Sequence, residues 1–285
     1  MKIIDTHLHA ISADAKTYPI APIGGHQSDW SRQRPVDVAG VLRAMDVAGI
    51  VKAVLVQAST VYGHDNRYVV DAIRAHPHRF VGVYSIDALA ADAVAQIERW
   101  QSEGLSGIRL FTTGSTMPGQ SHWLGHESSY AAWAHAEALG IPVCLQMTME
   151  GLPVLCSLLE RFPKVRVLLD HCARPDLSDG PPYTTAQALF EMAAYSGVYL
   201  KLTDRTLVAS ASGKSNPTSF LEKIVAAFGA NRIVWGSNFP AAHGSLAELL
   251  ETARVALRVL GEGEQALIFS GTAGILYPTL SAAKP

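Results

Sequence analysis

Three histidines lie where apolar runs of the sequence end, and their type and spacing suit them for chemistry. The run at 2–9 contains His7 and His9, and the two-residue period of a strand places both imidazoles on one face. A second run ends in Asp170-His171, where alternation predicts that His171 points inward and Asp170 outward or toward a neighbouring strand. Neutral imidazoles arranged in this way can ligate a metal ion or polarise a carbonyl group. The alternative is a set of core histidines satisfied by hydrogen bonds.

Other polar residues interrupt or follow apolar runs, and a buried polar group is costly unless it is paired or used. Asn238 follows two small residues, Gly236 and Ser237, which would let its side chain reach the same site. Arginine and lysine side chains there would clamp a carboxylate of the substrate, arginine being favoured where two parallel hydrogen bonds form. The catalytic candidates are His7, His9, His171 and Asn238. The expected substrate-binding residues are Arg109, Gln146, Lys201, Arg174, Asp204, Arg205, Trp30 and His243.

Short β-type runs alternate with longer segments of helical period, and this pattern predicts parallel strands joined by helices. The expected strands are 2–9, 51–59, 79–87, 105–113, 142–148, 165–173, 198–204 and 232–240. The expected helices are 37–48, 65–76, 90–103, 128–139, 151–162, 183–196, 217–229 and 245–260.

Eight strand and helix units are the number in an α/β fold of the (β/α)8 TIM barrel type. A doubly wound sheet is disfavoured because the first strand is not followed by a GxGxxG turn. Active sites of such barrels lie at the carboxyl ends of the strands. The long segment 10–36, which contains Trp30, begins at that end, so we expect it to fold over the mouth of the barrel.

Composition narrows the class of partner and the location. The chain has 285 residues, of which 48% are apolar and 17% charged, and its formal net charge is -2. A nucleic-acid partner is not expected, because lysines and arginines form no basic run. The three cysteines have no CxxC spacing, and no apolar run is long enough to cross a membrane. We therefore expect a cytoplasmic protein, without a membrane partner, that binds a small molecule and could form a homo-oligomer.

The combination of these motifs carries a resemblance. IDTHLH at 4–9, LDH at 169–171 and WGSNFP at 235–240 together resemble the amidohydrolase superfamily. Within it, the chain is most similar to the branch of small lactonases and decarboxylases that includes pyrone-dicarboxylate and sugar lactonases. The resemblance covers nearly the whole chain and implies one amidohydrolase-type barrel domain over residues 1–285, with hydrolysis of a lactone or related cyclic ester.

Three departures from the family pattern bear on metal binding. Arg109 stands where family members with two metals have a carboxylated lysine or a glutamate, and Gln146 stands where others have a histidine. Asn238 replaces the usual aspartate, and an amide cannot act as a general base. We therefore expect no cofactor; zinc, bound by His7, His9 and His171, is the alternative. Asn238 is compatible with two origins, a natural variant and an engineered replacement that traps substrate.

The leading functional hypothesis is hydrolysis of a lactone of a small, anionic or hydroxylated organic acid. The histidines would polarise the carbonyl and stabilise the oxyanion. A histidine or Asp204 would take the proton from water if Asn238 is native. The rival hypotheses are a lactone isomerase or a decarboxylase on the same scaffold, and a catalytically silent barrel that binds a small molecule.

Overall fold

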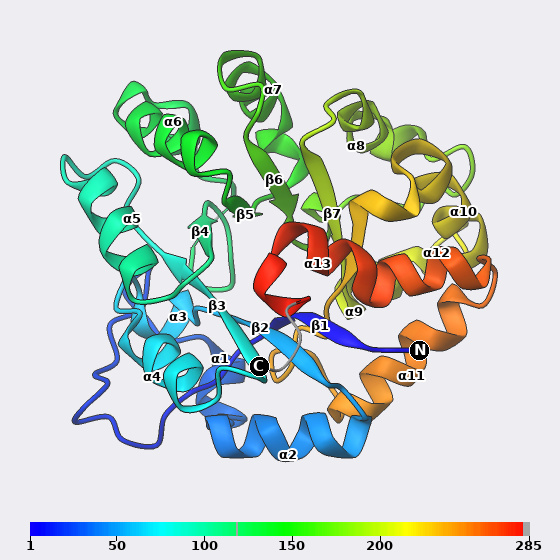
Figure 1. Ribbon diagram of the computed structural model, residues 1–285. Coiled ribbons are helices and arrows are strands. Elements are labelled where there is room, and N and C mark those ends of the chain that lie inside the picture. Colours follow the sequence, from blue (N-terminus) through cyan, green and yellow to red (C-terminus); the bar gives the residue numbers. More distant parts are fainter. Residues whose placement is uncertain (118, 282–285) are drawn as a thin grey trace.

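Eight parallel strands form one sheet that curls into a barrel surrounded by helices (Figure 1). The structure is a computed structural model that describes residues 1–117 and 119–281. The strands follow each other around the sheet in sequence order, which is the topology of the predicted (β/α)8 TIM barrel. They are β1 (Ile4–Leu8), β2 (Lys52–Val56), β3 (Phe80–Ser85), β4 (Gly107–Phe111), β5 (Pro142–Gln146), β6 (Arg166–Leu169), β7 (Val198–Leu202) and β8 (Ile233–Trp235).

Helices cover the outside of the sheet, and several begin or end at residues that satisfy their free backbone groups. Asp37 caps the helix that follows it by accepting from the backbone N–H of Gly40, and Ser245 forms a capping box with Glu248. The helices are α1 (Asp29–Gln33), α2 (Val38–Ala48), α3 (Ser59–Tyr62), α4 (Arg67–Ala75), α5 (Ala93–Ser102), α6 (Tyr130–Leu139), α7 (Leu152–Arg161), α8 (Gln187–Glu191), α9 (Asp204–Ser210), α10 (Pro217–Phe228), α11 (Leu246–Leu257), α12 (Glu262–Ala266) and α13 (Thr272–Leu276).

The barrel closes where β8 returns to β1. The hydroxyl of Thr6 donates to the carbonyl of Trp235 at 2.6 Å, and the backbone N–H of Asn238 donates to the carbonyl of His7 at 2.7 Å. Gly236 permits this approach, because a Cβ at this position would lie 2.6 Å from the Cβ of His7. The two segments that carry the histidine pair and the asparagine are therefore held side by side.

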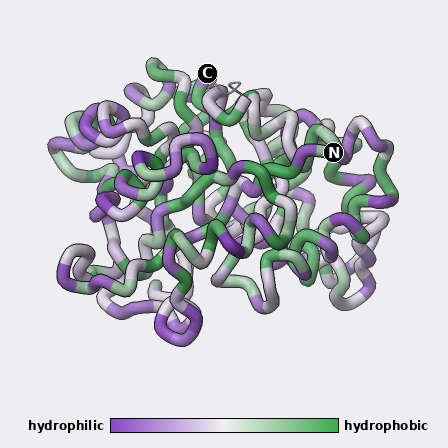
Figure 2. The backbone as a smooth tube through the Cα atoms, turned by 60° about the horizontal axis from the view of Figure 1, so that its bottom comes forward, coloured by the Kyte–Doolittle hydropathy of each residue, from purple (hydrophilic) through white to green (hydrophobic). Residues whose placement is uncertain are grey.

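The barrel interior is packed by alternate strand residues and is covered at the amino ends of the strands by the C-terminal segment. Ile4, Val54 and Leu168 belong to this interior cluster, as do Leu276 and Tyr277 from the C-terminal segment. The larger apolar cluster lies between the strands and the outer helices. Figure 2 shows hydrophobic stretches through the middle of the chain trace and hydrophilic ones in the outer loops. Because apolar side chains fill the barrel at the amino ends of the strands, the polar residues lie at the opposite mouth, at the carboxyl ends of the strands.

Each strand lies within its predicted run and ends before the end of that run, and two strands, β6 and β8, end much earlier than expected. β6 stops at Leu169 because His171 and the three residues after it have a left-handed backbone, with φ between 52° and 56°. β8 has only three residues, and the chain after it hydrogen-bonds to β1 through the backbone of Asn238. The predicted helix at 183–196 is a short helix, α8, flanked by single 3-10 turns. In the described part of the chain, no helix is long and apolar enough to cross a membrane.

Candidate active site

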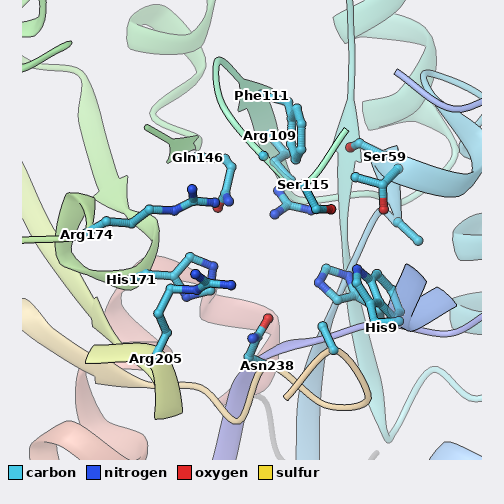
Figure 3. A pocket seen from close by; sticks show the side chains of 15 residues that line it. His9, Ser59, Arg109, Phe111, Ser115, Gln146, His171, Arg174, Arg205 and Asn238 are labelled. Atoms are coloured by element: carbon cyan, nitrogen blue, oxygen red, sulfur yellow. The ribbon is translucent and has the colours of Figure 1, made fainter. Parts of the chain in front are cut away.

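A pocket of about 530 Å³, open to solvent at its mouth, lies at the carboxyl ends of the strands (Figure 3). The loops after six of the eight strands contribute to it, as the fold predicts. Its lining residues are His9, Trp30, Ala58, Ser59, Thr60, Arg109, Phe111, Gly114, Ser115, Gln146, His171, Arg174, Arg205, Asn238 and Ala241.

His9 follows β1 and forms part of the pocket wall. Its Nδ1 lies 2.8 Å from the carbonyl oxygen of Val56, and its ring stacks on Trp30 with centroids 5.5 Å apart. The long segment 10–36 therefore does reach the mouth of the barrel. Burial and the nearby charge of Arg109 lower the pKa of His9 to about 3, so its imidazole is neutral at physiological pH.

His7 lies beneath this wall and is fully buried. Its ring centroid is 4.9 Å from that of His9 and 5.1 Å from that of His171. Its Nδ1 faces Lys201, with 3.1 Å between the two nitrogens, while its Nε2 is buried and has no hydrogen-bond partner among the described residues. Burial and the charge of Lys201 hold the pKa of His7 well below its usual value.

His171 and Arg174 are carried by the left-handed turn after β6. A left-handed conformation costs an L-residue about 1–2 kcal/mol, so a run of such residues persists only where the surroundings impose it. Nδ1 of His171 lies 2.7 Å from the hydroxyl of Thr203, which orients the ring. Burial lowers the pKa of His171 well below its usual value, and so do His7 and the two arginines nearby.

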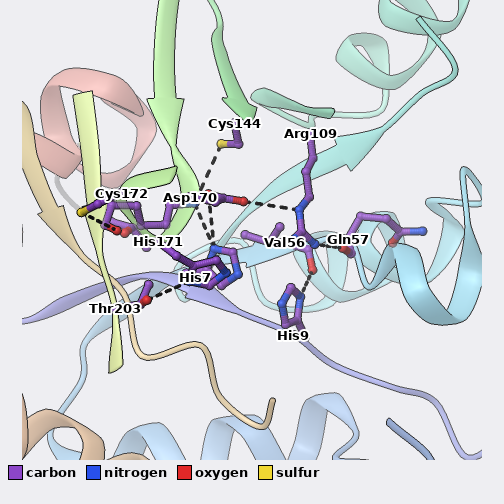
Figure 4. Close-up of polar contacts among 12 residues, drawn as sticks. His7, His9, Val56, Gln57, Arg109, Cys144, Asp170, His171, Cys172 and Thr203 are labelled. Carbon is purple, nitrogen blue, oxygen red and sulfur yellow. Dashed lines mark hydrogen bonds and ion pairs between the residues drawn. The ribbon is translucent and has the colours of Figure 1, made fainter. Parts of the chain in front are cut away.

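The sequence left two directions open for Asp170, outward or toward a neighbouring strand. Asp170 points into the barrel, where it meets Lys201 of the neighbouring strand β7. Its position follows from Leu168, an interior residue two positions earlier on β6. Its carboxylate pairs with Nζ of Lys201 at 2.8 Å and with Nε of Arg109 at 3.5 Å. Burial opposes ionisation, but the charge of Lys201 and the other basic groups hold the pKa of Asp170 well below its usual value. Figure 4 shows the contact between Arg109 and Asp170.

Lys201 is placed differently from the prediction that it binds substrate. It is fully buried and does not line the pocket. Its ammonium contacts Asp170 and His7 below the pocket floor. The carboxylate of Asp170 thus neutralises part of the positive charge of Lys201 and Arg109.

The three pocket arginines converge from different elements. Arg109 comes from β4 and donates to the carbonyl of Gln57 at 2.9 Å. Arg174 comes from the turn after β6, and Arg205 from α9. Burial and the charge of Arg205 lower the pKa of Arg174 to about 10, which leaves it cationic at neutral pH. Among the described residues that line the pocket there is no aspartate or glutamate, so the wall is strongly cationic.

Asn238 lines the pocket as expected, and its backbone is left-handed with φ of 59°. Asp204 lies beside it, outside the lining but near enough for the Asn238 amide to affect its ionisation. Burial raises the pKa of Asp204, which Asn238 partly offsets.

His243 is exposed and is not a lining residue, although its charge also acts on Asp204. Gln146 lines the pocket, and its Oε1 has no hydrogen-bond partner among the described residues.

Several residues in or next to the candidate site escaped the sequence analysis. Ser59 and Thr60 follow β2, and the buried hydroxyl of Ser59 has no partner among the described residues. Polar residues just after a strand were the signal that could have found them. Asp5 accepts hydrogen bonds from the backbone N–H groups of His7 and Ser237, both at 2.9 Å, so it ties β1 to the segment after β8.

The family is decided by a match over almost the whole chain. Residues 4–279 match the family model described as Amidohydrolase. The chain belongs to the amidohydrolase family. This agrees with the resemblance noted from the motifs at 4–9, 169–171 and 235–240.

Relatives of this amidohydrolase include a curated enzyme and solved structures. It is 29% identical over 141 residues to the L-fucono-1,5-lactonase of Burkholderia ambifaria, a match covering 46% of this chain and 48% of that enzyme. The chain therefore spans about half the length of the curated relative it matches.

Two solved structures share the fold of this amidohydrolase. One, from Pseudomonas putida, is provisionally assigned as a 2-pyrone-4,6-dicarboxylic acid hydrolase; it is 21% identical, with a TM-score of 0.78 and 98% of both chains covered. The other is an amidohydrolase from Burkholderia multivorans with bound zinc; it is 19% identical, with a TM-score of 0.77, covering 98% of this chain and 99% of that one.

The side chains of this amidohydrolase do not fit a zinc ion as they stand. Within residues 1–117 and 119–281, no group of three or more His, Cys, Asp or Glu side chains is arranged to hold a metal ion. His7, His9 and His171 would supply neutral nitrogens only, and Asp170 is already paired with Lys201. A zinc site needs at least three protein ligands that converge on one point, and the described side chains do not converge in this way.

Proposed function

We propose that this amidohydrolase hydrolyses the lactone of a small organic acid that carries at least one carboxylate. The observation that carries the proposal is the convergence of Arg109, Arg174 and Arg205 on a pocket that also contains His9 and His171. Arginine binds carboxylates through two parallel charge-assisted hydrogen bonds, and these act strongly in a partly desolvated pocket. The matches to an L-fucono-1,5-lactonase and to lactonase-like folds support the same reaction class.

In the proposed reaction, the arginines hold the substrate carboxylate while its lactone carbonyl lies over the histidines. Imidazole N–H groups donate to the carbonyl oxygen and stabilise the negative charge that develops on it. Asn238 orients water or substrate through its amide, because it cannot accept a proton at neutral pH. The remaining candidates for the base that activates water are the histidines and Asp204.

A panel of lactones tests the proposal. Carboxylated lactones should be hydrolysed with kcat/KM about 100-fold higher than neutral lactones of the same ring size, because only the former pair with the arginines. Products should be identified by NMR spectroscopy. Equal turnover of both classes would contradict the anionic substrate, and absence of hydrolysis across the panel would contradict the lactonase proposal.

Arginine variants locate the carboxylate. Arg174→Gln and Arg205→Gln should each raise KM for carboxylated lactones by about 10-fold, while changing KM for neutral lactones little. Arg161→Gln is the matched control, since Arg161 lies over Tyr130, outside the residues that line the pocket. Similar KM changes in all three variants would show that general charge, rather than these two side chains, attracts the substrate.

The rival activities have distinct readouts. Release of carbon dioxide would identify a decarboxylase, and an isomeric lactone would identify an isomerase. If no substrate is consumed but a carboxylated lactone raises the melting temperature, the barrel is a binding protein.

Zinc is tested separately by metal analysis of protein purified without chelator. We expect lactone hydrolysis to survive treatment with a chelator; stoichiometric zinc, lost together with activity, would overturn the metal-free proposal.

We also propose a cytoplasmic location. The three cysteines are free, which suits a reducing compartment.

A further inference from the structure

Two buried charged groups lie next to Nδ1 of His7, but only one is within hydrogen-bonding distance. Nζ of Lys201 is 3.1 Å from this nitrogen, whereas the nearer carboxylate oxygen of Asp170 is 3.6 Å away. An N–H···O hydrogen bond rarely extends beyond about 3.2 Å. An ammonium group can only donate, so Nδ1 of His7 must accept. The single hydrogen of this neutral imidazole then lies on Nε2.

His9, two residues further along the chain and directly after β1, is held in the opposite way. Its Nδ1 lies 2.8 Å from the carbonyl oxygen of Val56. A carbonyl oxygen can only accept, so Nδ1 of His9 carries the hydrogen and donates. Nε2 of His9 is left with its lone pair.

We infer that Lys201 and the Val56 carbonyl fix His7 and His9 in opposite tautomers, so that the carboxyl end of β1 presents one hydrogen-bond donor and one acceptor to the same substrate. Lys201 is a positioning residue in this arrangement, since it acts through His7 and does not line the pocket. The assignment of catalytic steps to the two histidines rests on the proposed function; the tautomers themselves do not.

This arrangement leaves the N–H group at Nε2 of His7 without a hydrogen-bond partner among the described residues, so the group is available to a ligand. This nitrogen is buried, and the His7 ring lies next to the rings of His9 and His171, which line the pocket, whereas His7 itself lies just beneath the lining. A buried N–H group without an acceptor is unfavourable, and a ligand oxygen that enters between the two rings would supply one. The acceptor we propose is the lactone carbonyl oxygen.

The resulting hydrolysis balances without a further reactant. When the substrate carboxylate pairs with Arg109, it offsets the charge that helps to lower the pKa of His9. The oxygen of water then bonds to the carbonyl carbon while its proton passes to Nε2 of His9, and the carbonyl electron pair moves to the oxygen held by His7. The carbon–oxygen bond of the ring then breaks, and the proton on His9 passes to the leaving ring oxygen. The product is a hydroxy acid, and both histidines return to their starting tautomers.

Nitrogen-15 NMR spectroscopy of histidine-labelled protein tests the tautomers without any substrate. A protonated ring nitrogen and a bare one have clearly separated chemical shifts, and His7→Asn and His9→Asn variants identify which signals belong to each ring. We expect His7 to be protonated on Nε2 and His9 on Nδ1. A His7 ring protonated on Nδ1 would overturn the proposal, whatever lactone activity the enzyme has.

Two substitutions identify the group that sets the tautomer. Asp170→Asn keeps the ammonium beside Nδ1 and should leave His7 protonated on Nε2. Lys201→Met leaves Asp170 as the charged neighbour of Nδ1, so the hydrogen should move to Nδ1. Cys144→Ala is the matched control, since its Sγ lies 3.9 Å from Nζ of Lys201. The opposite pattern, with the tautomer lost in Asp170→Asn and retained in Lys201→Met, would assign the role to Asp170. If neither variant folds, the wild-type spectrum still decides whether His7 carries its hydrogen on Nε2.

Kinetics separate positioning from a merely structural role. In folded Lys201→Met, kcat for a lactone should fall about 100-fold with little change in KM, as for the loss of one oxyanion donor. A rise in KM with unchanged kcat would contradict the proposed use of His7. If the tautomers are as inferred but no lactone is hydrolysed, the proposed function fails and the tautomer assignment stands.

Discussion

At the scale of single residues, the site is a cationic pocket in which neutral imidazoles are kept neutral by burial. Asn238 lines the pocket, and its backbone is left-handed. It lies beside Asp204, whose pKa is raised by burial. A second carboxylate at this position would face both Asp204 and the carboxylate of the proposed substrate.

We therefore predict that Asn238→Asp lowers kcat/KM for a carboxylated lactone by about 10-fold, because like charges close together in a partly buried site repel by more than about 1 kcal/mol. Backbone strain should not contribute, since aspartate tolerates a positive φ as asparagine does. Asn231→Asp, at an exposed position, is the charge-matched control. A rise in turnover by orders of magnitude would instead show that a carboxylate is the missing base.

At the scale of elements, the segment between β1 and α2 shapes the mouth of the pocket. It carries Trp30, and the loop after β4 holds it, since the hydroxyl of Thr116 donates to the carbonyl of Ile23 at 2.7 Å. Gly24 fits closely here: a Cβ on this residue would lie 2.1 Å from the carbonyl oxygen of Thr116. Ser115, next to Thr116, lines the pocket.

We predict that Gly24→Ala raises KM for the substrate by about 10-fold with a smaller effect on kcat, because the segment must move away from Thr116 and the wall formed by Trp30 shifts. Gly25→Ala is a matched control. Its φ of 80° resembles the 87° of Gly24, but its Cβ would meet nothing within 4 Å. Equal KM values in the two variants would show that contact with Thr116 does not position the segment.

At the scale of the whole molecule, buried neutral histidines link folding to pH. His7, His9 and His171 have pKa values lowered chiefly by burial, His9 to about 3. In the unfolded chain each titrates near its usual value of about 6.5. Between the unfolded and folded pKa values the unfolded chain binds more protons, so stability is lost as the pH falls below about 6.5. The raised pKa of Asp5 acts in the opposite direction at lower pH.

We predict that the free energy of unfolding falls between pH 6 and pH 5, by about 1 kcal/mol from His9 and further from His7 and His171, whose pKa values are also lowered by burial. Denaturant unfolding at several pH values measures this slope. The slope measures the number of protons that the chain takes up on unfolding. His9→Gln should reduce this number by one, whereas His26→Gln, at an exposed position, should not change the slope. A pH-independent stability over this range would contradict the neutral buried state of these rings.

The sequence by itself determined the barrel and the end of it that carries the site. Strand and helix periods are local properties of the chain, and polar residues at strand ends, such as His9 and Arg109, gather at one mouth in any parallel barrel. The family resemblance could be recognised from three short motifs, because each motif lies at the end of a strand.

Only the tertiary structure decided how deep each polar side chain lies and what it faces. Arg109 reaches the pocket, whereas Lys201 stays beneath it, because Asp170 turns into the barrel and pairs with the ammonium. The direction of Asp170 depends on which face of β6 packs inward, and the direction of His171 on a left-handed turn that local preference disfavours. Both are set by packing between strands distant in sequence, so local spacing could not predict them.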